Sequence, residues 1–339
     1  MKKELIELLA CPLCKGDLNY EITETTSDLP WQEIMEGHLA CLSCNRKYPI
    51  SGGIPRLLPD LQMAAEVQKT VDGFGYEWQT FNHQIQDGYM SDRKNFFDFI
   101  HPVTEGFFEG KIVLDAGCGM GRFLKLGAAF GSREIIGLDL SRSVESAYRN
   151  TRHLPNAHVV QGDILFPPFK QSFDYVLSIG VLQFLSDPQG GFRELTKLLK
   201  PGGGISIWVY SKEGNEGVIR ILSPIRKHIT SRLPRPLLHG FSYLLGTLQF
   251  LILRGIYKPA NEWKLLKWIT ALLPKNEYLY YNSQLSLHAL VSVVFDHLVP
   301  QLVVYLSKEE VMAWFESEKL TTVQISSRNN MSWRVHGTA

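Results

Sequence analysis

The stretch Val113-Leu114-Asp115-Ala116-Gly117-Cys118-Gly119-Met120-Gly121-Arg122-Phe123 joins an apolar strand to a helix through a glycine-rich turn. Glycines let the backbone approach a ligand closely, and a helix N-terminus favours an anionic group such as a phosphate or a carboxylate. The G-x-G-x-G spacing is weak evidence when it stands alone, and it lacks the second turn that a pyrophosphate needs. Asp115 would also repel a phosphate. The turn therefore favours a ligand that carries an ammonium or a sulfonium cation.

Strand-like and helical runs alternate along the chain around this turn. Helices are expected to begin near Gly121, Ser141 and Pro188. The five expected strands are residues 112–114, 135–138, 157–160, 175–179 and 205–210. This alternation predicts an α/β fold with a parallel, doubly wound sheet.

Two more strands are expected at the C-terminal end of the chain, at residues 320–325 and 331–335 around a turn at 326–330. A helix with capping-box spacing begins at Ser307 and precedes them. We therefore expect a mostly parallel sheet of seven strands that ends in an antiparallel hairpin. Residues 214–300 interrupt the alternation, because they are mostly helical and apolar, and they form a helical insertion.

Acidic residues follow two of the expected strands. Asp139 lies eighteen residues past Gly121, at the end of strand 135–138, where an acid can accept hydrogen bonds from both ribose hydroxyls. Asp163 follows the third strand and could accept a hydrogen bond from an adenine amino group, with Ile164 packed on the ring. Together with the glycine turn, these residues predict a nucleoside ligand that carries a cation.

The ordered motifs of residues 111–210 resemble those of class I S-adenosylmethionine-dependent methyltransferases, of the broad small-molecule type that includes the quinone-biosynthesis methyltransferases. The resemblance implies a cofactor site in which the methionine moiety is surrounded by Asp115, Gly117, Gly119 and Gly121. It also implies that Asp139 contacts the ribose and that Asp163 and Ile164 contact the adenine. Ser178 and Gly180 would form the strand edge near the amino-acid end. Gln183 stands where many relatives have histidine, so no general base is implied there.

Four of the five cysteines form two Cys-x-x-Cys pairs, Cys11 with Cys14 and Cys41 with Cys44, separated by 26 residues. Four thiolates at this spacing indicate a structural zinc site, because they fill a tetrahedral ion completely. The alternative is a pair of redox dithiols or free thiols. If residues 1–60 form a separate module, removing zinc should unfold them while the sheet of residues 111–210 stays folded.

This cysteine region resembles the small zinc-ribbon family of activators of tRNA and protein methyltransferases. The shared motifs lie at residues 11–18, 37–41 and 48–58, so the resemblance covers residues 1 to about 60. Members of that family usually bind a separate methyltransferase, and the resemblance implies an activator-like ribbon fused in cis. Whether such a ribbon activates, stabilises or recognises substrate stays open.

Length and composition are those of a globular chain with two units. Its 339 residues carry 35 Lys and Arg against 34 Asp and Glu, and the net charge of +1 gives no overall case for nucleic acid. The apolar run at the start is broken by Glu4 and Glu7, so it is not expected to be a secretory signal. Thiolate pairs indicate a reducing compartment, so we expect a cytoplasmic protein, with membrane association as an alternative.

Between residues 61 and 110 the chain is rich in aromatic residues and is expected to be a linker and an N-terminal flap. Residues 73–81 combine Gly73 and Gly75 with Tyr76 and Trp78, which suits a lid that moves on glycine hinges and closes over a cofactor. The alternative is an aromatic linker that packs on the core. The expected domains are then residues 1–60, 61–110 and 111–339.

The insertion is basic and apolar at once. From residue 218 to residue 275 there are ten Lys and Arg and one acid, Glu262, which gives a net charge of +9. Residues 236–253 are uncharged and place one apolar stripe on a helix, formed by Leu237, Phe241, Leu244, Leu248 and Leu251. The favoured interpretation is a cap over a substrate pocket. The alternatives are a membrane-surface element that meets a lipid-linked acceptor and, at the short limit of length, a membrane span.

Methyl transfer from a sulfonium is an in-line displacement that depends mainly on positioning. A hydroxyl acceptor would also need a base, and His297, in the segment 295–300 between the insertion and the returning sheet, is the candidate. The favoured hypothesis is methylation of a small-molecule, glycan or lipid-linked acceptor rather than nucleic acid. The alternatives are an RNA or protein methyltransferase that uses the ribbon and the basic insertion, and a non-catalytic adapter.

Overall fold

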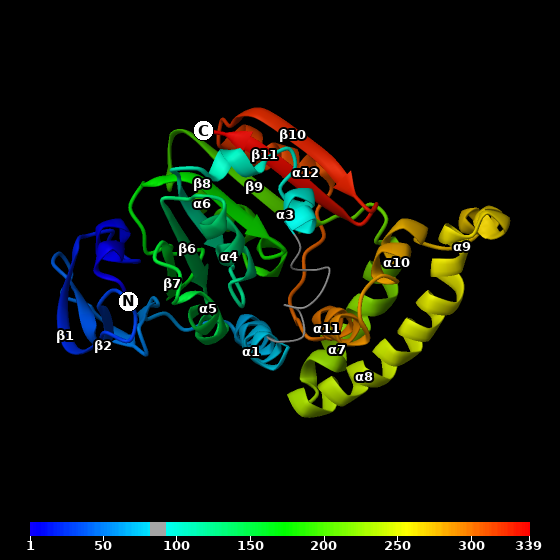
Figure 1. Ribbon diagram of the computed structural model, residues 1–339, viewed down its shortest axis with the longest axis horizontal. Helices are drawn as coiled ribbons and strands as arrows, with labels where there is room; N and C mark the ends of the chain where they lie inside the picture. The colour runs from blue at the N-terminus through cyan, green and yellow to red at the C-terminus, as the bar shows by residue number, and fades with distance from the viewer. Residues whose placement is uncertain (82–92) are drawn as a thin grey trace.

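One sheet of eleven strands runs through the computed structural model, which describes residues 1–81 and 93–339. The strand order is β1-β2-β3-β4-β7-β6-β5-β8-β9-β11-β10 (Figure 1). The strands are β1 (Leu18–Thr26), β2 (Glu33–Cys41), β3 (Lys47–Ser51), β4 (Ile54–Leu57), β5 (Ile112–Ala116), β6 (Glu134–Asp139), β7 (Ala157–Gly162), β8 (Phe173–Ile179), β9 (Leu199–Tyr210), β10 (Thr321–Arg328) and β11 (Ser332–Thr338). The last seven strands of the order form the predicted seven-stranded unit.

The strands from β7 to β9 are parallel, and β11 and β10 close the far edge as an antiparallel hairpin, which confirms the predicted fold class. The hairpin turn is tighter than expected and is confined to residues 329–331. Asn329 and Asn330 take up left-handed backbone conformations, with φ of 54° and 51°. Asparagine tolerates this region, so both strands extend beyond the predicted bounds.

Helices cover both faces of the parallel strands. Those beside the sheet are α1 (Ala65–Thr80), α3 (Arg93–Phe99), η3 (Glu105–Phe108), α4 (Arg122–Ala129), α5 (Val144–Thr151), η4 (Leu182–Phe184), α6 (Pro188–Thr196) and α12 (Lys308–Ser317). Side chains of α6 and α12 join one apolar core, and side chains of α3, α4 and α5 join the other. All five residues of β5 are buried, as expected for a parallel strand covered on both faces.

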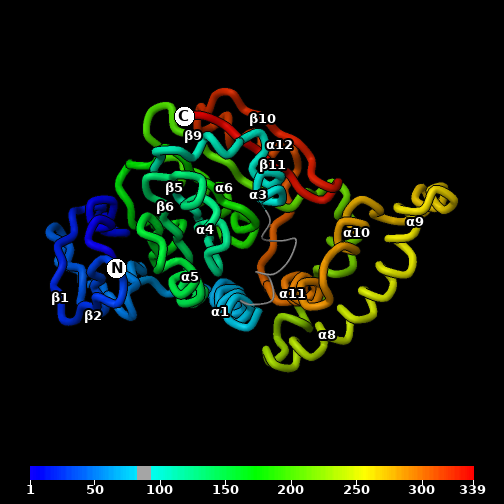
Figure 2. Tube along the Cα trace, in the orientation of Figure 1, coloured from blue at the N-terminus to red at the C-terminus, as the bar shows by residue number. Residues whose placement is uncertain are grey.

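The predicted insertion is helical and lies beside the sheet unit (Figure 2). Its elements are η5 (Val218–Leu222), α7 (Ser223–His228), η6 (Thr230–Arg232), α8 (Arg235–Ile252), η7 (Leu253–Tyr257), α9 (Lys258–Glu262), η8 (Lys264–Ala271), α10 (Asn276–Asn282) and α11 (Leu287–Leu298). The N-cap of α11 is Ser286, whose side chain accepts a hydrogen bond from the backbone N–H of Ala289. The chain then returns to the sheet through α12, where Ser307 and Glu310 form the predicted capping box.

The four predicted zinc ligands meet at one point of the N-terminal unit, beside η1 (Lys3–Leu8). Their sulfur atoms all lie within 4.8 Å of one another, with Cys14 and Cys41 Sγ 3.4 Å apart and Cys11 and Cys44 Sγ 3.7 Å apart. Tetrahedral zinc with Zn–S bonds of about 2.3 Å would place its sulfurs about 3.8 Å apart. The donor set and its spacing fit a closed structural zinc site.

The zinc ribbon is built into the edge of the large sheet. Strand β4 pairs in parallel with β7, with Arg56 opposite Gln161 and Leu57 opposite Gly162. The Lys2 ammonium donates to two backbone carbonyls of the sheet unit, those of Leu154 and Ala157. These contacts bind the predicted unit 1–60 to the predicted unit 111–339.

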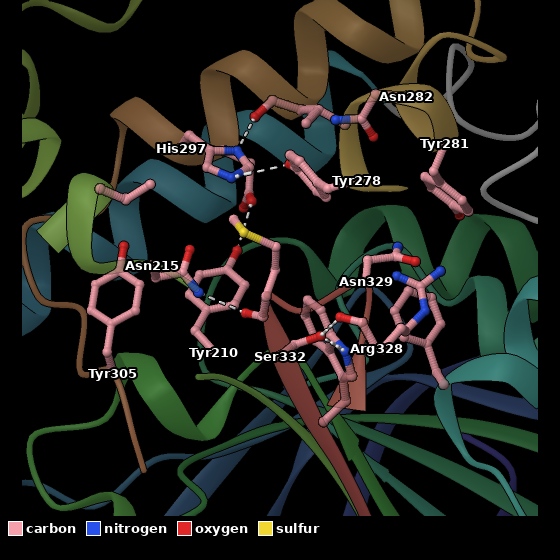
Figure 3. A pocket seen from close by; sticks show the side chains of 16 residues that line it. Tyr210, Asn215, Tyr278, Tyr281, Asn282, His297, Tyr305, Arg328, Asn329 and Ser332 are labelled. Carbon is pink, nitrogen blue, oxygen red and sulfur yellow. Dashed lines mark hydrogen bonds between the residues drawn. The ribbon is translucent and has the colours of Figure 1, made fainter. Parts of the chain in front are cut away.

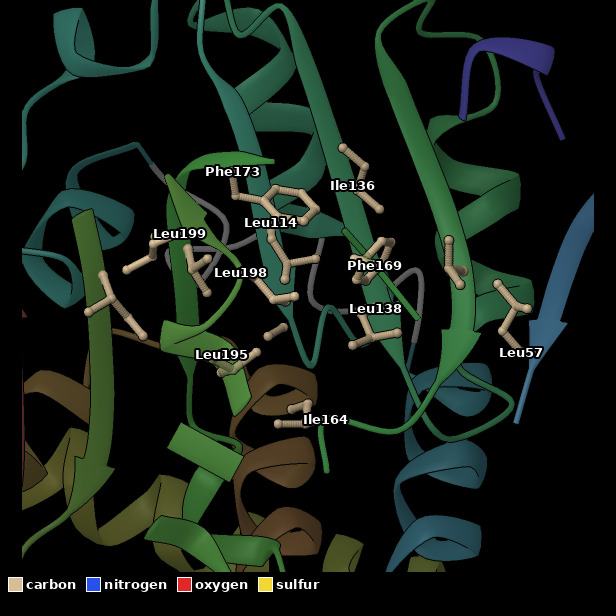
Figure 4. Packing of buried hydrophobic residues seen from close by; sticks show 14 of the residues in the cluster. Leu57, Leu114, Ile136, Leu138, Ile164, Phe169, Phe173, Leu195, Leu198 and Leu199 are labelled. Atoms are coloured by element: carbon tan, nitrogen blue, oxygen red, sulfur yellow. The ribbon is translucent and has the colours of Figure 1, made fainter. Parts of the chain in front are cut away.

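The two units also share one apolar core. Figure 4 shows part of it, from Leu57 of β4 across Leu138 and Leu114 to Phe173. Leu5 and Leu39 of the ribbon belong to the same cluster. Because one core spans both units, the ribbon's folding free energy also supports the sheet.

The shared core changes the expectation for zinc removal. We expect chelation of zinc to lower the melting temperature of the whole chain by about 10 °C. Losing the zinc should remove about 3 kcal/mol of stabilisation that the ribbon gives to the sheet, and each kcal/mol lowers the melting temperature of a large domain by about 2–4 °C. Near-ultraviolet circular dichroism and tryptophan fluorescence would follow the transition. A ribbon that melts alone, with an unchanged transition for the sheet, would show that the two units are energetically independent.

Candidate functional site

A pocket with a volume of about 140 Å³ lies at the carboxyl ends of β5, β6, β7 and β8. The predicted cofactor residues that line it are Gly117, Gly119, Asp139, Asp163, Ile164 and Gly180. Helix α1 covers the pocket with Phe74 and Trp78, and α11 contributes Asp296. Parallel doubly wound sheets bind ligands at this edge, so the pocket stands where the fold predicts a site.

The glycine turn brings the backbone itself to the pocket. Its first amides, Gly117 N and Cys118 N, donate to the carbonyl of Leu138 at 2.7 and 3.0 Å, which folds the turn back over β6. Gly117 has a φ of +89°, and a Cβ there would lie 2.2 Å from Cγ2 of Val181. Only glycine fits this position, and α4 begins directly after the turn.

Asp139 ends β6 and holds the turn from the other side. Its carboxylate accepts hydrogen bonds from Gly119 N at 3.0 Å and from both N and Oγ of Ser141 at 2.8 Å. A carboxylate has about four acceptor positions, so it can accept from ligand hydroxyls as well. Its place in the pocket fits the predicted ribose contact.

Asp163 and Ile164 follow β7 and line the pocket beside each other. Leu165 N donates to Asp163 Oδ1 at 2.9 Å, and burial raises the pKa of this carboxyl. Ile164 is 5% exposed and presents an apolar surface. A polar acceptor beside an apolar wall suits an adenine, which offers an amino group at the edge of a flat ring.

Three predicted cofactor residues lie behind the pocket and do not line it: Asp115, Gly121 and Ser178. Ser178 is fully buried, and its hydroxyl donates to the carbonyl of Ala116 at 2.9 Å, so it ties β8 to β5. Gly121 meets Ala147 of α5, where a Cβ would lie 3.1 Å from the backbone. The residues next to Ser178, Ile179 and Gly180, line the pocket instead.

Asp115 is a buried carboxyl next to the glycine turn. Burial raises its pKa to about 8, although the Arg122 guanidinium opposes the shift. Its Oδ2 atom has no hydrogen-bond partner among the residues that the structure describes. A cation in the neighbouring pocket would offset the cost of charging this group, so Asp115 fits a ligand with a sulfonium or an ammonium group.

The predicted flap is a continuous helix, and its glycines are not hinges. Gly73 and Gly75 lie inside α1, where a Cβ on Gly73 would be 2.7 Å from Cγ2 of Val299. They allow α1 to pack closely against its neighbours. Trp78 lines the pocket over Gly119, whereas Tyr76 packs on Phe295 and His239. Of the predicted linker and flap at residues 61–110, residues 82–92 lie outside the described residues, and α3 and η3 follow them.

A second cavity, of about 120 Å³, lies between β9, the insertion and the C-terminal hairpin. Its walls are aromatic with polar tips, and Figure 3 shows His297 and Tyr278 facing Tyr210 across it. Arg328 of β10 closes one side, ion-paired with Asp98 and placed over the ring of Phe99. The cavity has the character of a site for a small organic molecule.

His297, the predicted acid or base, lines this second cavity. Its Nδ1 lies 2.7 Å from the carbonyl of Val293, which can only accept, so Nδ1 carries a proton. Nε2 lies 3.4 Å from the hydroxyl of Tyr278, and the ring stacks on Tyr210. His297 does not line the cofactor pocket. Its catalytic role stays a prediction.

Asp296 joins the two cavities, because it lines the cofactor pocket, the aromatic cavity and the narrow space between them. It is half-buried, and Tyr210 donates to its Oδ2 at 3.3 Å. Burial raises its pKa, which makes its carboxylate a stronger base. The sequence pattern predicts its neighbour His297 instead, since nothing in the segment indicates which side chain faces the cofactor.

Two further charged side chains line the space between the cavities, Glu77 of α1 and Arg122 of α4. Burial and the nearby charge of Asp296 raise the pKa of Glu77 well above its usual range. Burial lowers the pKa of Arg122, although Asp115, Asp296 and Glu77 favour its charge. Arg122 therefore places a positive charge near both carboxyls, which opposes the effect of burial on the pKa of each.

Two family models match the chain. The methyltransferase domain matches residues 114–207, which contain β5 to most of β9 and the glycine turn. The Trm112p-like protein family matches residues 2–53, which contain the four clustered cysteines.

Curated relatives match about a third of the chain. Over 114 residues the chain is 29% identical to a tRNA U34 carboxymethyltransferase of Pseudoalteromonas atlantica. The matched region covers 33% of this chain and 35% of that protein. Over 100 residues the chain is 37% identical to a demethylmenaquinone methyltransferase of Staphylococcus haemolyticus. That matched region covers 28% of this chain and 42% of that protein. The chain thus spans less than half the length of these two relatives.

Solved structures resemble a larger part of the chain at low identity. A complex that contains the Haloferax volcanii Trm112 methyltransferase activator is 17% identical, covers 79% of this chain and 97% of that chain, and gives a TM-score of 0.45. A SAM-dependent methyltransferase from Aquifex aeolicus is 14% identical, covers 78% and 97%, and gives a TM-score of 0.42.

Replacing Asp139 by Ala should weaken the binding of S-adenosylhomocysteine by about 1.5–3 kcal/mol, the cost of losing hydrogen bonds to a charged group. Calorimetric titration would measure the change. Asp139→Asn keeps one acceptor oxygen, which can serve Ser141 or Gly119 but not both, so it should weaken binding less than Asp139→Ala does. Asp17→Ala, an exposed acid of the ribbon, should leave the affinity unchanged. Full affinity in Asp139→Ala would contradict the ribose contact.

Asp115→Asn should stabilise the ligand-free protein increasingly as the pH rises. The folded pKa of about 8 lies above the ordinary value of 3.8, so the cost of burying this acid is absent below pH 3.8 and complete above pH 8. At about 1.4 kcal/mol per pKa unit, the gain should be roughly 3–4 kcal/mol larger at pH 8 than at pH 5. Urea unfolding at both pH values would measure it, with exposed Asp28→Asn as a control. A gain that does not change with pH would contradict the assignment.

Proposed function

Because the chain carries an S-adenosylmethionine-dependent methyltransferase domain joined to a Trm112p-like zinc ribbon, we propose that it transfers a methyl group from S-adenosylmethionine to a small organic acceptor. The observation that supports this proposal is the aromatic cavity that meets the cofactor pocket at Asp296. The insertion, absent from the matched domain, supplies much of that cavity. A glycan or lipid-linked acceptor fits the same proposal if only the end of the molecule that receives the methyl group enters the aromatic cavity.

The cavity offers both apolar surface and fixed polar groups to an acceptor. Burial raises the pKa of Tyr278 to about 12 and that of Tyr210 well above its usual range, so both hydroxyls stay protonated at neutral pH. They can orient an acceptor by hydrogen bonds while their rings pack against it.

Asp296 is the proposed general base. The acceptor hydroxyl would form an oxygen–carbon bond to the methyl group as the sulfur–carbon bond breaks, and its proton would pass to the Asp296 carboxylate. S-adenosylmethionine supplies the methyl group on a sulfonium, which departs as a neutral thioether. Tyr210 holds the carboxylate by its hydrogen bond, and Arg122 favours its charged form.

RNA is the second candidate acceptor. A tRNA U34 carboxymethyltransferase and a probable tRNA methyltransferase 9B of Mus musculus match about a third of the chain at 29% and 30% identity. The basic insertion would supply the cations that RNA needs. An enclosed cavity is harder to reconcile with this acceptor, because a base would have to leave its stack to enter.

Location follows from the same features. The thiolate zinc site requires a reducing compartment, so we propose that the protein works in the cytoplasm. The basic, apolar insertion further suggests contact with a membrane surface.

Asp296→Asn should lower methyl transfer by a factor of about 10² to 10⁴, the usual contribution of a general base, while S-adenosylhomocysteine still binds. The assay would use S-adenosylmethionine with a labelled methyl group and a cell extract separated into small molecules, lipids and RNA. The matched control is His297→Gln on the same helix, which should lower transfer less than Asp296→Asn.

Two results would overturn this assignment. Full transfer by Asp296→Asn would exclude it as the base. Label that enters the RNA fraction, is released by ribonuclease and falls steeply with added salt would favour the second candidate.

A further inference from the structure

Helix α8 carries its apolar stripe on the outside of the molecule. Leu237, Phe241, Leu244, Leu248 and Leu251 follow one another at helical spacing, and all are exposed. Leu244, Leu248 and Leu251 are 66%, 56% and 63% exposed. Figures 1 and 2 show α8 along the outer edge of the structure. The described part of the chain provides no cover for this stripe.

The inner face of α8 is made of small and polar residues as well as leucine. Its buried residues are Leu238, Ser242 and Gly246, and a Cβ on Gly246 would lie 2.8 Å from Cγ2 of Val291 on α11. Close packing against α11 therefore fixes which face of α8 points outward. The predicted cap over the substrate pocket does not bury the stripe, because the stripe faces away from α11.

The exposed apolar surface continues past the end of α8. Helix η8 and the residues beside it contain Trp263, Leu265, Trp268 and Leu272, which are 63%, 87%, 68% and 73% exposed. Lys264 and Lys267 alternate with them and are also exposed. Tryptophan and lysine side by side are characteristic of the polar boundary of a lipid bilayer, where rings enter the headgroup region and ammonium groups stay in water.

We propose that α8 and η8 form a docking face that lies flat on a membrane surface containing anionic lipids. The apolar stripe would enter the headgroup boundary, and exposed cations of this region such as Lys264 and Lys267 would meet the negative lipids. This inference goes beyond methyl transfer and does not depend on it.

Other occupants fit this face less well. A second copy would bring another net charge of +9 against the first, and like charges oppose association. RNA would use the cations but would leave the leucine stripe exposed. The continuous helical run Arg235–Glu262 is long and apolar enough to span a bilayer, yet a span would have to separate α8 from α11 and place Arg254 in the hydrocarbon.

The test is flotation of the zinc-loaded full chain with two kinds of vesicle, phosphatidylcholine alone and phosphatidylcholine with phosphatidylglycerol. We expect binding to the anionic vesicles at low salt and at least tenfold weaker binding to the neutral ones. The variant Leu244→Gln with Leu248→Gln and Leu251→Gln should bind anionic vesicles at least tenfold more weakly. The variant Lys264→Gln with Lys267→Gln should reduce both binding and its dependence on salt.

The control is Leu42→Gln with Leu61→Gln, which changes leucines that are 65% and 52% exposed outside the insertion. It should bind as the unchanged protein does. All the changed side chains are exposed, so each variant should fold. Melting temperature and S-adenosylhomocysteine binding would check this.

Several outcomes would overturn the proposal. These are no binding by the unchanged protein, equal binding by the triple leucine variant, or a dimer that binds no vesicles and dissociates in that variant. Binding to neutral vesicles that resists alkaline carbonate extraction would indicate a membrane span instead.

Discussion

The direction of strand order reverses at β5, and the rest of the structure depends on this reversal. Strand β5 pairs in parallel with β6 on one side and with β8 on the other, so the connections from these strands leave on opposite faces. A crevice opens at the carboxyl ends because no connection crosses it. The glycine turn, Asp139 and Asp163 all reach this crevice from strand ends, and α1 and α11 then cover it.

The insertion has two different surfaces because its helices pack through small residues. Gly246 and Ser242 let α8 approach α11 closely, and α11 carries Asp296 and His297 to the aromatic cavity. The stripe of exposed leucines on α8 therefore faces outward. One packing contact thus positions the proposed general base on one side and the proposed membrane-docking face on the other.

The zinc ribbon supports the cofactor pocket through the sheet. Its last strand, β4, pairs with β7 at Gly162, directly before Asp163 of the pocket. Arg56 strengthens this edge by hydrogen bonds to Gln161 and Glu145. Loss of the structural metal would therefore be felt at the cofactor pocket through the sheet, whereas no ribbon residue lines the aromatic cavity.

The sequence by itself determined the features that depend on local patterns. These features are the two cysteine knuckles, the alternating strands and helices, the glycine turn and the acids at strand ends. Each of them is defined by a few residues that are neighbours in the sequence, so it can be recognised without the tertiary structure. Tertiary structure decided which side chains line the pocket: Asp115 and Ser178 lie behind it, whereas Asp296 reaches it. It also decided that the glycines of α1 are packing points and that the α8 stripe faces outward. The aromatic cavity combines Tyr210, Asp296 and Arg328, which no local spacing connects, so only the packing of distant helices and strands could bring them together.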